Sequence, residues 1–259
     1  MRRTPQSVLR HPVAPRYLAG SGDPRYVTAP LYAVGWTVST QHLPGIRLAS
    51  PGGSRTLQLA PRPDGESAPH PHGESWTITG RPDRGWAWSI SADGQTPVEI
   101  IGAATDALTS GHAPTGNDEF AVLRSAGWSV SRGRLTTATS PDGTCVVGTT
   151  AGAGLSILAD CPDTGRTLWR AHLSGATPTP VVTALIGSLA SPYGVLRPRH
   201  ALPVSPSHLR VGEAVRIPAH RLVDLRVAAA RRALRRGQSG PFPLPPSPAG
   251  DSRSPRRRP

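Results

Sequence analysis

Lysine is missing from this sequence, and all 29 basic residues are arginine. A GC-rich genome explains this usage, because arginine codons are rich in G and C and lysine codons are not. The absence excludes chemistry that needs a lysine amine, such as Schiff-base formation or phosphate binding by a P-loop lysine. Cysteine is nearly missing too, since only Cys145 and Cys161 occur. A secreted disulfide scaffold would carry more, so we expect two reduced, partly buried thiols, with a bond between them as the alternative.

Long hydrophobic runs are also missing. No stretch approaches the roughly 18 apolar residues that a membrane-spanning helix needs. The first residues, MRRTPQSVLRHPVAP, are basic but lack the apolar segment of a signal peptide. We therefore expect a cytoplasmic protein without a membrane span. Proline (30) and glycine (28) are abundant instead, which indicates many turns and some disordered sequence.

The net charge of +13 is unevenly distributed. Residues 197–259 contain 14 arginines against three acidic residues, whereas residues 1–196 are nearly neutral. This separation favours an acidic partner for the C-terminal part and not for the rest of the chain.

An internal repeat is the strongest signal in the sequence. Three blocks recur in the same order: PLYAVGWTVS (30–39) with VLRSAGWSVS (122–131), LASPGGSRTLQL (48–59) with ATSPDGTCVVGT (138–149), and WSISADGQTPVEIIGAATDALTS (88–110) with WRAHLSGATPTPVVTALIGSLAS (169–191). Most of the shift in register comes from one insertion in the first copy, around PRPDGESAPHPHGES. Three matching blocks in order indicate a duplicated structural unit.

Each block has a local interpretation. A short helix ends at Gly35 or Gly127, and a strand starts at the tryptophan that follows. Ser-Pro-x-Gly marks a hairpin tip, because proline fixes φ and glycine accepts a positive φ. Thr96, Pro97 and Glu99 have the spacing of a capping box at the start of the closing helix. Each unit is thus predicted as helix, roughly four antiparallel strands and helix, an α+β fold with helices on one face of the sheet.

The predicted organisation has seven parts. They are a disordered N-terminus (1–11), a first α+β unit (12–111), a linker (112–118), a second unit (119–192), a proline-rich linker (193–218), a basic amphipathic helix (219–236) and a disordered Pro/Arg-rich tail (237–259).

Several motifs resemble a known family. VAPRYLAGSGDPRYVTAPL (13–31), the Ser-Pro-Asp-Gly turn and the block around TPVEIIGAATDAL are similar to the two-copy SPDY domain proteins of filamentous actinobacteria. The resemblance covers roughly residues 12–192, although the first copy has Gly52 where the family tends to have Asp. The SPDY domain has no known function, so the resemblance implies no site residues.

The six tryptophans include two candidates for surface contacts. Trp36 and Trp128 match between the copies, as do Trp88 and Trp169, which favours a core position for all four. Trp76 and Trp86 have no tryptophan counterpart, so these two are the candidates for stacking on a ligand, with burial in the core as the alternative.

Signals for chemistry are weak. His70 and His72 could begin a metal site but lack convincing further ligands, so we expect no metal and no cofactor. No nucleophile-elbow pattern or dinucleotide-binding loop is present, which favours a protein that is not an enzyme.

The C-terminal arginines are the remaining candidates. The predicted contacts with nucleic acid or another acidic partner are Arg231, Arg232, Arg235, Arg236, Arg256, Arg257 and Arg258. Alternatively, the helix docks its apolar side on the body and these arginines are simply solvated; an anionic membrane is a lesser option.

The sequence does not define a function. It favours a non-catalytic interaction protein with an unidentified protein partner, and the alternative is a nucleic-acid-associated protein anchored by its C-terminal arginines. The oligomeric state stays open.

Overall fold

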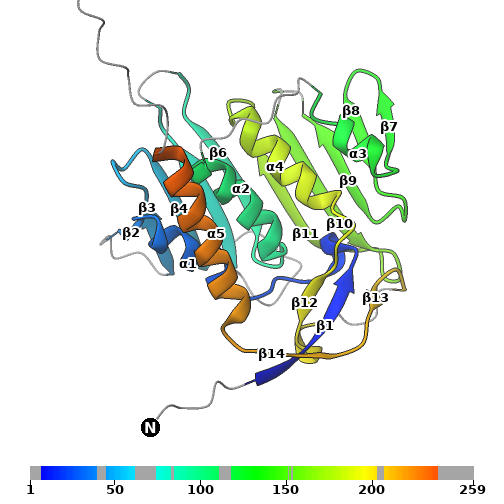
Figure 1. Ribbon diagram of the computed structural model, residues 1–259. Helices are drawn as coiled ribbons and strands as arrows, with labels where there is room; N and C mark the ends of the chain where they lie inside the picture. The colour runs from blue at the N-terminus through cyan, green and yellow to red at the C-terminus, as the bar shows by residue number, and fades with distance from the viewer. Residues whose placement is uncertain are drawn as a thin grey trace, which may run out of the picture.

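The computed structural model (Figure 1) describes residues 7–39, 45–61, 74–82, 85–110, 118–150, 152, 154–202 and 207–238. The first copy consists of α1 (Arg25–Ala33), β2 (Thr37–Val38), β3 (Ile46–Ala49), β4 (Arg55–Pro61), β5 (Glu74–Gly80), β6 (Trp88–Asp93) and α2 (Val98–Ser110). The second copy repeats this order as α3 (Ala121–Ser125), β7 (Ser129–Arg132), β8 (Thr136–Thr139), β9 (Cys145–Thr149), β10 (Leu155–Cys161), β11 (Arg166–Leu173) and α4 (Thr179–Leu189). The α+β class and the duplication are therefore confirmed.

The two copies share one sheet of ten strands in the order β2-β3-β4-β5-β6-β11-β10-β9-β8-β7. The expected number of roughly four strands per unit is corrected to five, because the stretch between the tryptophan and the Ser-Pro-x-Gly turn forms two strands, β2 and β3 in the first copy and β7 and β8 in the second. The copies join where β6 and β11 pair antiparallel, with Ser91 opposite His172. Since β6 and β11 are equivalent strands, the strand order reads alike from both ends, as a pseudo-twofold axis requires. Joining the two inner edges also removes two rows of unpaired backbone groups.

The core lies on one face of this sheet. Buried and exposed positions alternate along β6 and β10, which is the pattern of a sheet covered on one side. Helices α2 and α4 lie across the covered face and contact each other (Figure 1). Buried residues from both copies form one continuous cluster that includes the matched pairs Trp36/Trp128 and Trp88/Trp169. The predicted core positions of these four tryptophans are confirmed.

The glycine and proline motifs form the turns that the sequence predicts. Gly35 and Gly127 have φ of 91° and 83°, and the tryptophan N–H that follows each donates to a carbonyl five residues back, at 3.0 Å in both copies. Gly53 donates to the Ser50 carbonyl at 2.8 Å, as Gly143 does to Ser140 at 2.9 Å. These local motifs fix the same chain reversals twice.

The capping box is not formed. Helix α2 begins at Val98, and the buried Thr96 hydroxyl has no hydrogen-bond partner among the described residues. The Glu99 carboxylate accepts hydrogen bonds from Arg197 instead, so the prediction for these two side chains is wrong. An ion pair formed far along the chain replaces the local cap.

A second, smaller sheet corrects two predicted boundaries. Strand β1 (Ser7–Ala14) pairs with β12 (Val195–Arg197), β13 (Arg210–Val211) and β14 (Val215–Pro218), and the 3-10 helices η1 (Arg16–Leu18) and η2 (Arg199–Ala201) flank these strands. The expected disorder is therefore wrong for residues 7–11, and the expected linker 193–218 is largely structured. Strands β12, β13 and β14 have three, two and four residues, too few to be recognised from their alternation alone. They form because β1 supplies the hydrogen-bonding partner.

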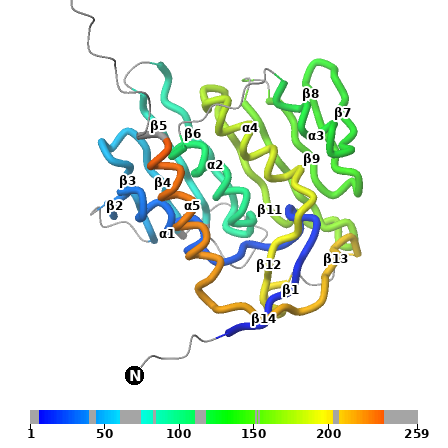
Figure 2. The backbone as a smooth tube through the Cα atoms, viewed as in Figure 1, coloured from blue at the N-terminus to red at the C-terminus, as the bar shows by residue number. Residues whose placement is uncertain are grey.

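The chain continues into α5 (Arg221–Gln238), which packs against α1 and α2 of the first copy. The tube in Figure 2 shows how the C-terminal part returns across the N-terminal half of the molecule. Cys145 and Cys161 are both free and buried, and burial raises the pKa of the Cys145 thiol well above its usual value.

Candidate nucleic-acid interface

Helix α5 is amphipathic, and its apolar side is the side that docks. Val223, Val227, Ala230 and Leu234 are half-buried, as their helical spacing predicts. The predicted helix 219–236 is observed two residues later, at Arg221–Gln238. The alternative in which the helix docks on the body is therefore the arrangement that the structure shows.

Arg226 is the polar anchor of this docking. Its Nη2 donates to Asp106 Oδ1 at 2.8 Å, and its Nη1 forms a second bond to Asp106 Oδ2. The guanidinium lies 4.5 Å from the centre of the Tyr26 ring, a cation–π contact. Burial by itself lowers the pKa of Arg226, but the bonds to Asp106 outweigh it, so the net pKa is raised. The Arg226 side chain thus stabilises the docking of α5, and its guanidinium is not available to bind a partner.

Gly102 on α2 gives this anchor its space. A Cβ at this position would lie 3.0 Å from Tyr26 Cε1 and 3.1 Å from Arg226 Nη2. These separations are tighter than ordinary contacts, so a side chain here would press on both groups.

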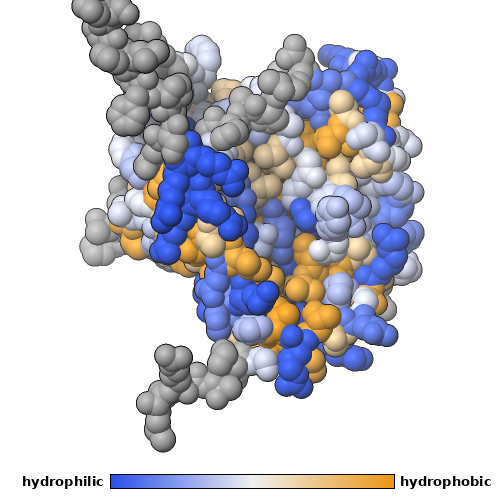
Figure 3. Space-filling model, in the orientation of Figure 1, coloured by the Kyte–Doolittle hydropathy of each residue, from blue (hydrophilic) through white to orange (hydrophobic). Residues whose placement is uncertain are grey.

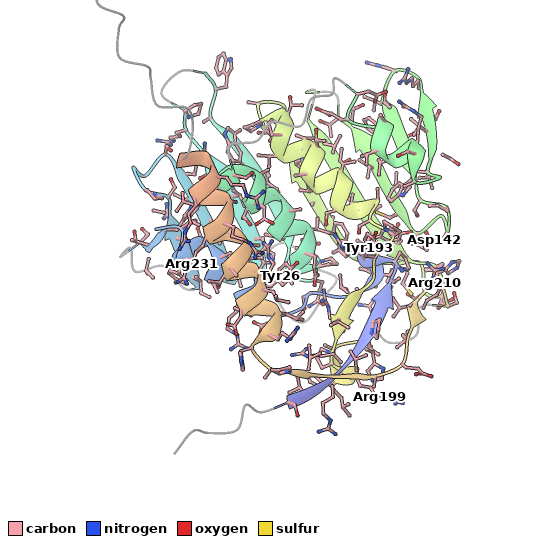
Figure 4. All side chains as sticks on the ribbon, viewed as in Figure 1. Tyr26, Asp142, Tyr193, Arg199, Arg210 and Arg231 are labelled. Carbon is pink, nitrogen blue, oxygen red and sulfur yellow. The ribbon has the colours of Figure 1, made fainter. Side chains whose placement is uncertain are left out.

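The four predicted contact arginines, Arg231, Arg232, Arg235 and Arg236, are all exposed in the last turns of α5. Figure 3 shows the strongly hydrophilic surface that covers this helix. Figure 4 labels Arg231 on α5 and Tyr26 on α1 beneath it. We call these four residues the α5 arginine face. Arg256, Arg257 and Arg258 lie outside the described residues.

The two candidate tryptophans have opposite surroundings. Trp76 is only 2% exposed and shares the core face of β5 with Ile78, so its prediction as a surface contact is wrong. Trp86 is 85% exposed and precedes β6, which starts at Trp88. Within β6, Trp88 and Ile90 are both buried on the core face. The alternation of Trp76 with Ile78 is the signal that could have placed Trp76 in the core.

Trp86 borders a groove of about 540 Å³ between the copies. Arg55 and Arg81 from the first copy also line it, opposite Pro178 and Pro180 at the start of α4. The groove thus combines an exposed indole with two guanidinium groups.

The groove and the α5 arginine face lie at the same end of the molecule. The first turns of α2 and α5 line a common cavity, and further along both helices Arg226 of α5 donates a hydrogen bond to Asp106 of α2. Because two successive contacts follow the same order along both chains, the two helices run parallel. The last turns of α5 therefore lie beyond the end of α2, where Leu108 lines the groove with Trp86. Figure 1 shows the end of α5 and the β5–β6 connection on this side of the molecule.

A wider groove of about 1010 Å³ lies at the opposite end, beside the Ser-Pro-Asp-Gly turn. Figure 4 labels Asp142, Tyr193 and Arg210 in this region, and Asp142 and Arg210 line the groove. Asp142 Oδ1 already accepts hydrogen bonds from the hydroxyls of Ser140 (2.5 Å) and Thr144 (3.0 Å). This carboxylate stabilises the turn and does not stand free as an acid or base.

No group of three metal-binding side chains occurs among the described residues, and His70 and His72 lie outside them. In the same part of the chain, no helix has the length and apolar character needed to cross a membrane.

The ten-stranded sheet, whose strand order reads alike from both ends, defines a duplicated α+β protein whose two halves pair through the equivalent strands β6 and β11. The family model of the SPDY domain, described as a domain of unknown function (DUF317), matches residues 49–115 and 139–195. The match to two separate segments is consistent with the two-copy SPDY domain that the motif resemblance predicted. Each match begins at the Ser-Pro-x-Gly turn and ends after the closing helix. Comparison with curated proteins and with solved structures gives no match.

Sequence reasoning missed the residues that hold the C-terminal segment in place. Glu99 and Asp106, which bind Arg197 and Arg226, correspond to Pro180 and Gly187 in the second copy. A difference in charge between equivalent positions was the available signal. It could not identify the partners, because those arginines lie about a hundred residues further along the chain.

Proposed function

We propose that this protein is a non-catalytic nucleic-acid-binding protein that uses the α5 arginine face as its electrostatic anchor. The observation that carries the proposal is the docking of α5, which buries Arg226 and leaves the next four arginines exposed on a fixed helix. A docked helix presents these charges with little loss of conformational entropy on binding.

Charge balance along α5 supports a polyanionic partner. The only acidic residue of the helix is Asp224, in its first turn, where it lies 3.5 Å from His220. The last turns carry arginines without an acidic residue of the same helix between them. Arginine binds phosphate with paired donors, and the density of phosphates along a nucleic acid suits a closely spaced group.

Trp86 favours single-stranded over duplex nucleic acid. An exposed indole beside arginines can stack on an unpaired base, whereas bases inside a duplex are already stacked. The groove beside Trp86 lies at the same end as the α5 arginine face, so one strand of several nucleotides could contact both. The alternative is an acidic protein partner, which would use the arginines but would not need the indole.

The test is fluorescence anisotropy of labelled single-stranded and duplex DNA with the full chain at about 50 and about 200 mM salt. The variant R231Q/R232Q/R235Q/R236Q should weaken binding by roughly 10²–10³-fold and reduce the salt dependence by about one unit per lost contact. Trp86→Ala should weaken only single-strand binding, by roughly tenfold.

The matched control is R134Q/R199Q/R210Q/R216Q, which removes the same charge from four exposed arginines away from α5. It should retain most of the affinity. Equal losses in the two quadruple variants would indicate only a net-charge effect, and absence of DNA binding at low salt would refute the proposal. A cytoplasmic location and an actinobacterial origin stay predictions from the sequence.

A further inference from the structure

A cavity of about 460 Å³ lies between the small sheet and helices α1, α2 and α5. Its volume is in the range of small-molecule sites in proteins. Apolar side chains from four elements line it, namely Tyr26, Val98, Leu196, Leu222 and Val223. This cavity is separate from the α5 arginine face, which lies at the other end of the same helix.

One wall of the cavity is a fixed polar cluster. Arg197 is 3% exposed in its side chain and Glu99 is 9% exposed, and they pair through two bonds of 2.8 and 2.6 Å. Arg197 also donates to the carbonyls of Ala19 and Gly20, at 3.1 Å each. The charges of this pair are therefore satisfied within the protein, and they give the cavity a rigid wall.

Gly22 brings the backbone close to this wall. Its φ is +86°, and a Cβ here would lie 2.8 Å from Val98 and 3.0 Å from the Arg197 guanidinium. The loop can follow this path only with glycine, which fixes the outline of the cavity on that side.

Arg10 is a cavity-lining residue with an unused hydrogen-bond donor. It extends from β1 and lines the cavity, and its Nε is buried without a hydrogen-bond partner among the described residues. Of the two lining carboxylates, Glu99 pairs with Arg197, and Asp23 pairs with Arg25 at 2.7 Å while also interacting electrostatically with Arg10. A buried N–H without a partner is costly, and an anionic group would satisfy this donor with a charge-assisted hydrogen bond.

The rim adds to the positive charge. Arg199 and His200 of η2 line the cavity and are exposed. Figure 4 labels Arg199 at this end of the molecule. The apolar interior and the excess of guanidinium groups together select a ligand with two unlike parts.

We propose that this cavity binds a small amphiphilic anion, with an apolar body inside the cavity and a carboxylate or phosphate on Arg10. An apolar molecule without charge would leave Arg10 Nε unsatisfied, and a small inorganic anion would leave the apolar walls unfilled. The two features are explained together only by a ligand that carries both.

The test is a titration of the full chain with 8-anilinonaphthalene-1-sulfonate, a fluorescent amphiphilic anion, followed by displacement with octanoate or octyl phosphate. One saturable site that both competitors empty supports the proposal, and the stronger competitor identifies the head group. Arg10→Gln should weaken binding at least tenfold by removing the charge. Val223→Phe should weaken binding severalfold by narrowing the apolar part of the cavity.

Arg216→Gln is the matched control, because Arg216 is exposed on β14 of the same small sheet. It should bind like the natural chain, as should R231Q/R232Q/R235Q/R236Q, which separates this site from the DNA interface. Thermal unfolding of each variant distinguishes a lost site from a lost fold. Binding that keeps its full affinity in both Arg10→Gln and Val223→Phe, or that disappears in the α5 variant, would overturn the proposal.

Discussion

The two copies of the repeat have nearly the same strands and turns, yet helix α5 packs against the helices of the first copy. The difference follows one stripe of α2, where Glu99, Gly102 and Asp106 are spaced three and four residues apart. Glu99 binds Arg197, Gly102 leaves space for the Arg226 side chain, and Asp106 binds Arg226. The equivalent positions on α4 are Pro180, Thr183 and Gly187, which offer neither charge. A duplicated scaffold has thus become asymmetric through three positions on one helix face.

The first prediction concerns the buried ion pair between Arg197 and Glu99, which has no equivalent on α4. Replacing Arg197 with Met leaves Glu99 as an unpaired buried charge and should cost about 3–5 kcal/mol of unfolding free energy. Urea denaturation measures the loss. Arg199→Met, two residues further and exposed, should change stability by about 0.5 kcal/mol or less. A loss under about 1 kcal/mol for Arg197→Met would show that the pair does not hold the segment in place.

The second prediction compares equivalent positions on α2 and α4. Gly102→Val should destabilise by about 1–3 kcal/mol, because the added atoms press on Tyr26 and Arg226. Thr183→Val should instead be neutral or stabilising by up to about 1 kcal/mol, since the buried Thr183 hydroxyl has no described partner. Thermal unfolding shows whether each variant is more or less stable than the natural chain. If both substitutions destabilised the protein, or neither did, the packing of α5 on α2 would not explain the difference between the two helices.

The third prediction isolates the docking of α5. Arg226→Ala removes the bonds to Asp106 and the contact with Tyr26, and should weaken local protection of α5 and α1 by about 1–2 kcal/mol. Hydrogen exchange should accelerate in these two helices and stay unchanged in α3 and α4. Arg221→Ala, an exposed change on the same helix, is the control. Acceleration spread over both copies would indicate global unfolding and not undocking.

The smallest effect is expected at the hairpin tips, where the second copy has Asp142 and the first has Gly52. Burial raises the pKa of Asp142, but hydrogen bonds from Ser140 and Thr144 outweigh it and the net pKa is lowered. Its stabilisation is therefore present above the unfolded pKa of about 3.9 and is lost as the pH falls through the lower, folded value.

Asp142→Ala should accordingly cost about 1 kcal/mol at pH 7. The deficit should be constant down to about pH 5 and shrink below about pH 4. Urea denaturation at several pH values follows the difference. A deficit that grows as the pH falls would mean that the carboxylate does not stabilise the turn in its charged form.

The features that the sequence predicted are those whose causes are local. Gly35 and Gly127 end their helices because a residue with positive φ is needed there, and the Ser-Pro-x-Gly turns need no distant partner. The amphipathic α5 follows from periodicity, and the inward positions of four tryptophans follow from their match between the two copies. The prediction for Trp76 is wrong because a match between copies does not show which face of a strand a residue takes, whereas the alternation of Trp76 with Ile78 does.

The candidate site was predictable in part. The four α5 arginines are exposed as their helical spacing indicates, whereas the lack of a counterpart in the other copy gave the right surroundings for Trp86 and the wrong ones for Trp76. The use of Glu99 was not predictable, since a capping box and an ion pair require the same residue. The choice depends on a guanidinium that the small sheet brings to within 2.6 Å.

The sequence by itself determined the repeat, its turns, its core tryptophans and the basic character of the C-terminal helix, because periodicity and backbone preference act over a few residues. Only the tertiary structure decided that the copies share one ten-stranded sheet, that β1 orders the segment after α4, and that α5 docks on the first copy. Strand edges and buried charges select their partners by distance in space, and the partners here lie up to about two hundred residues apart.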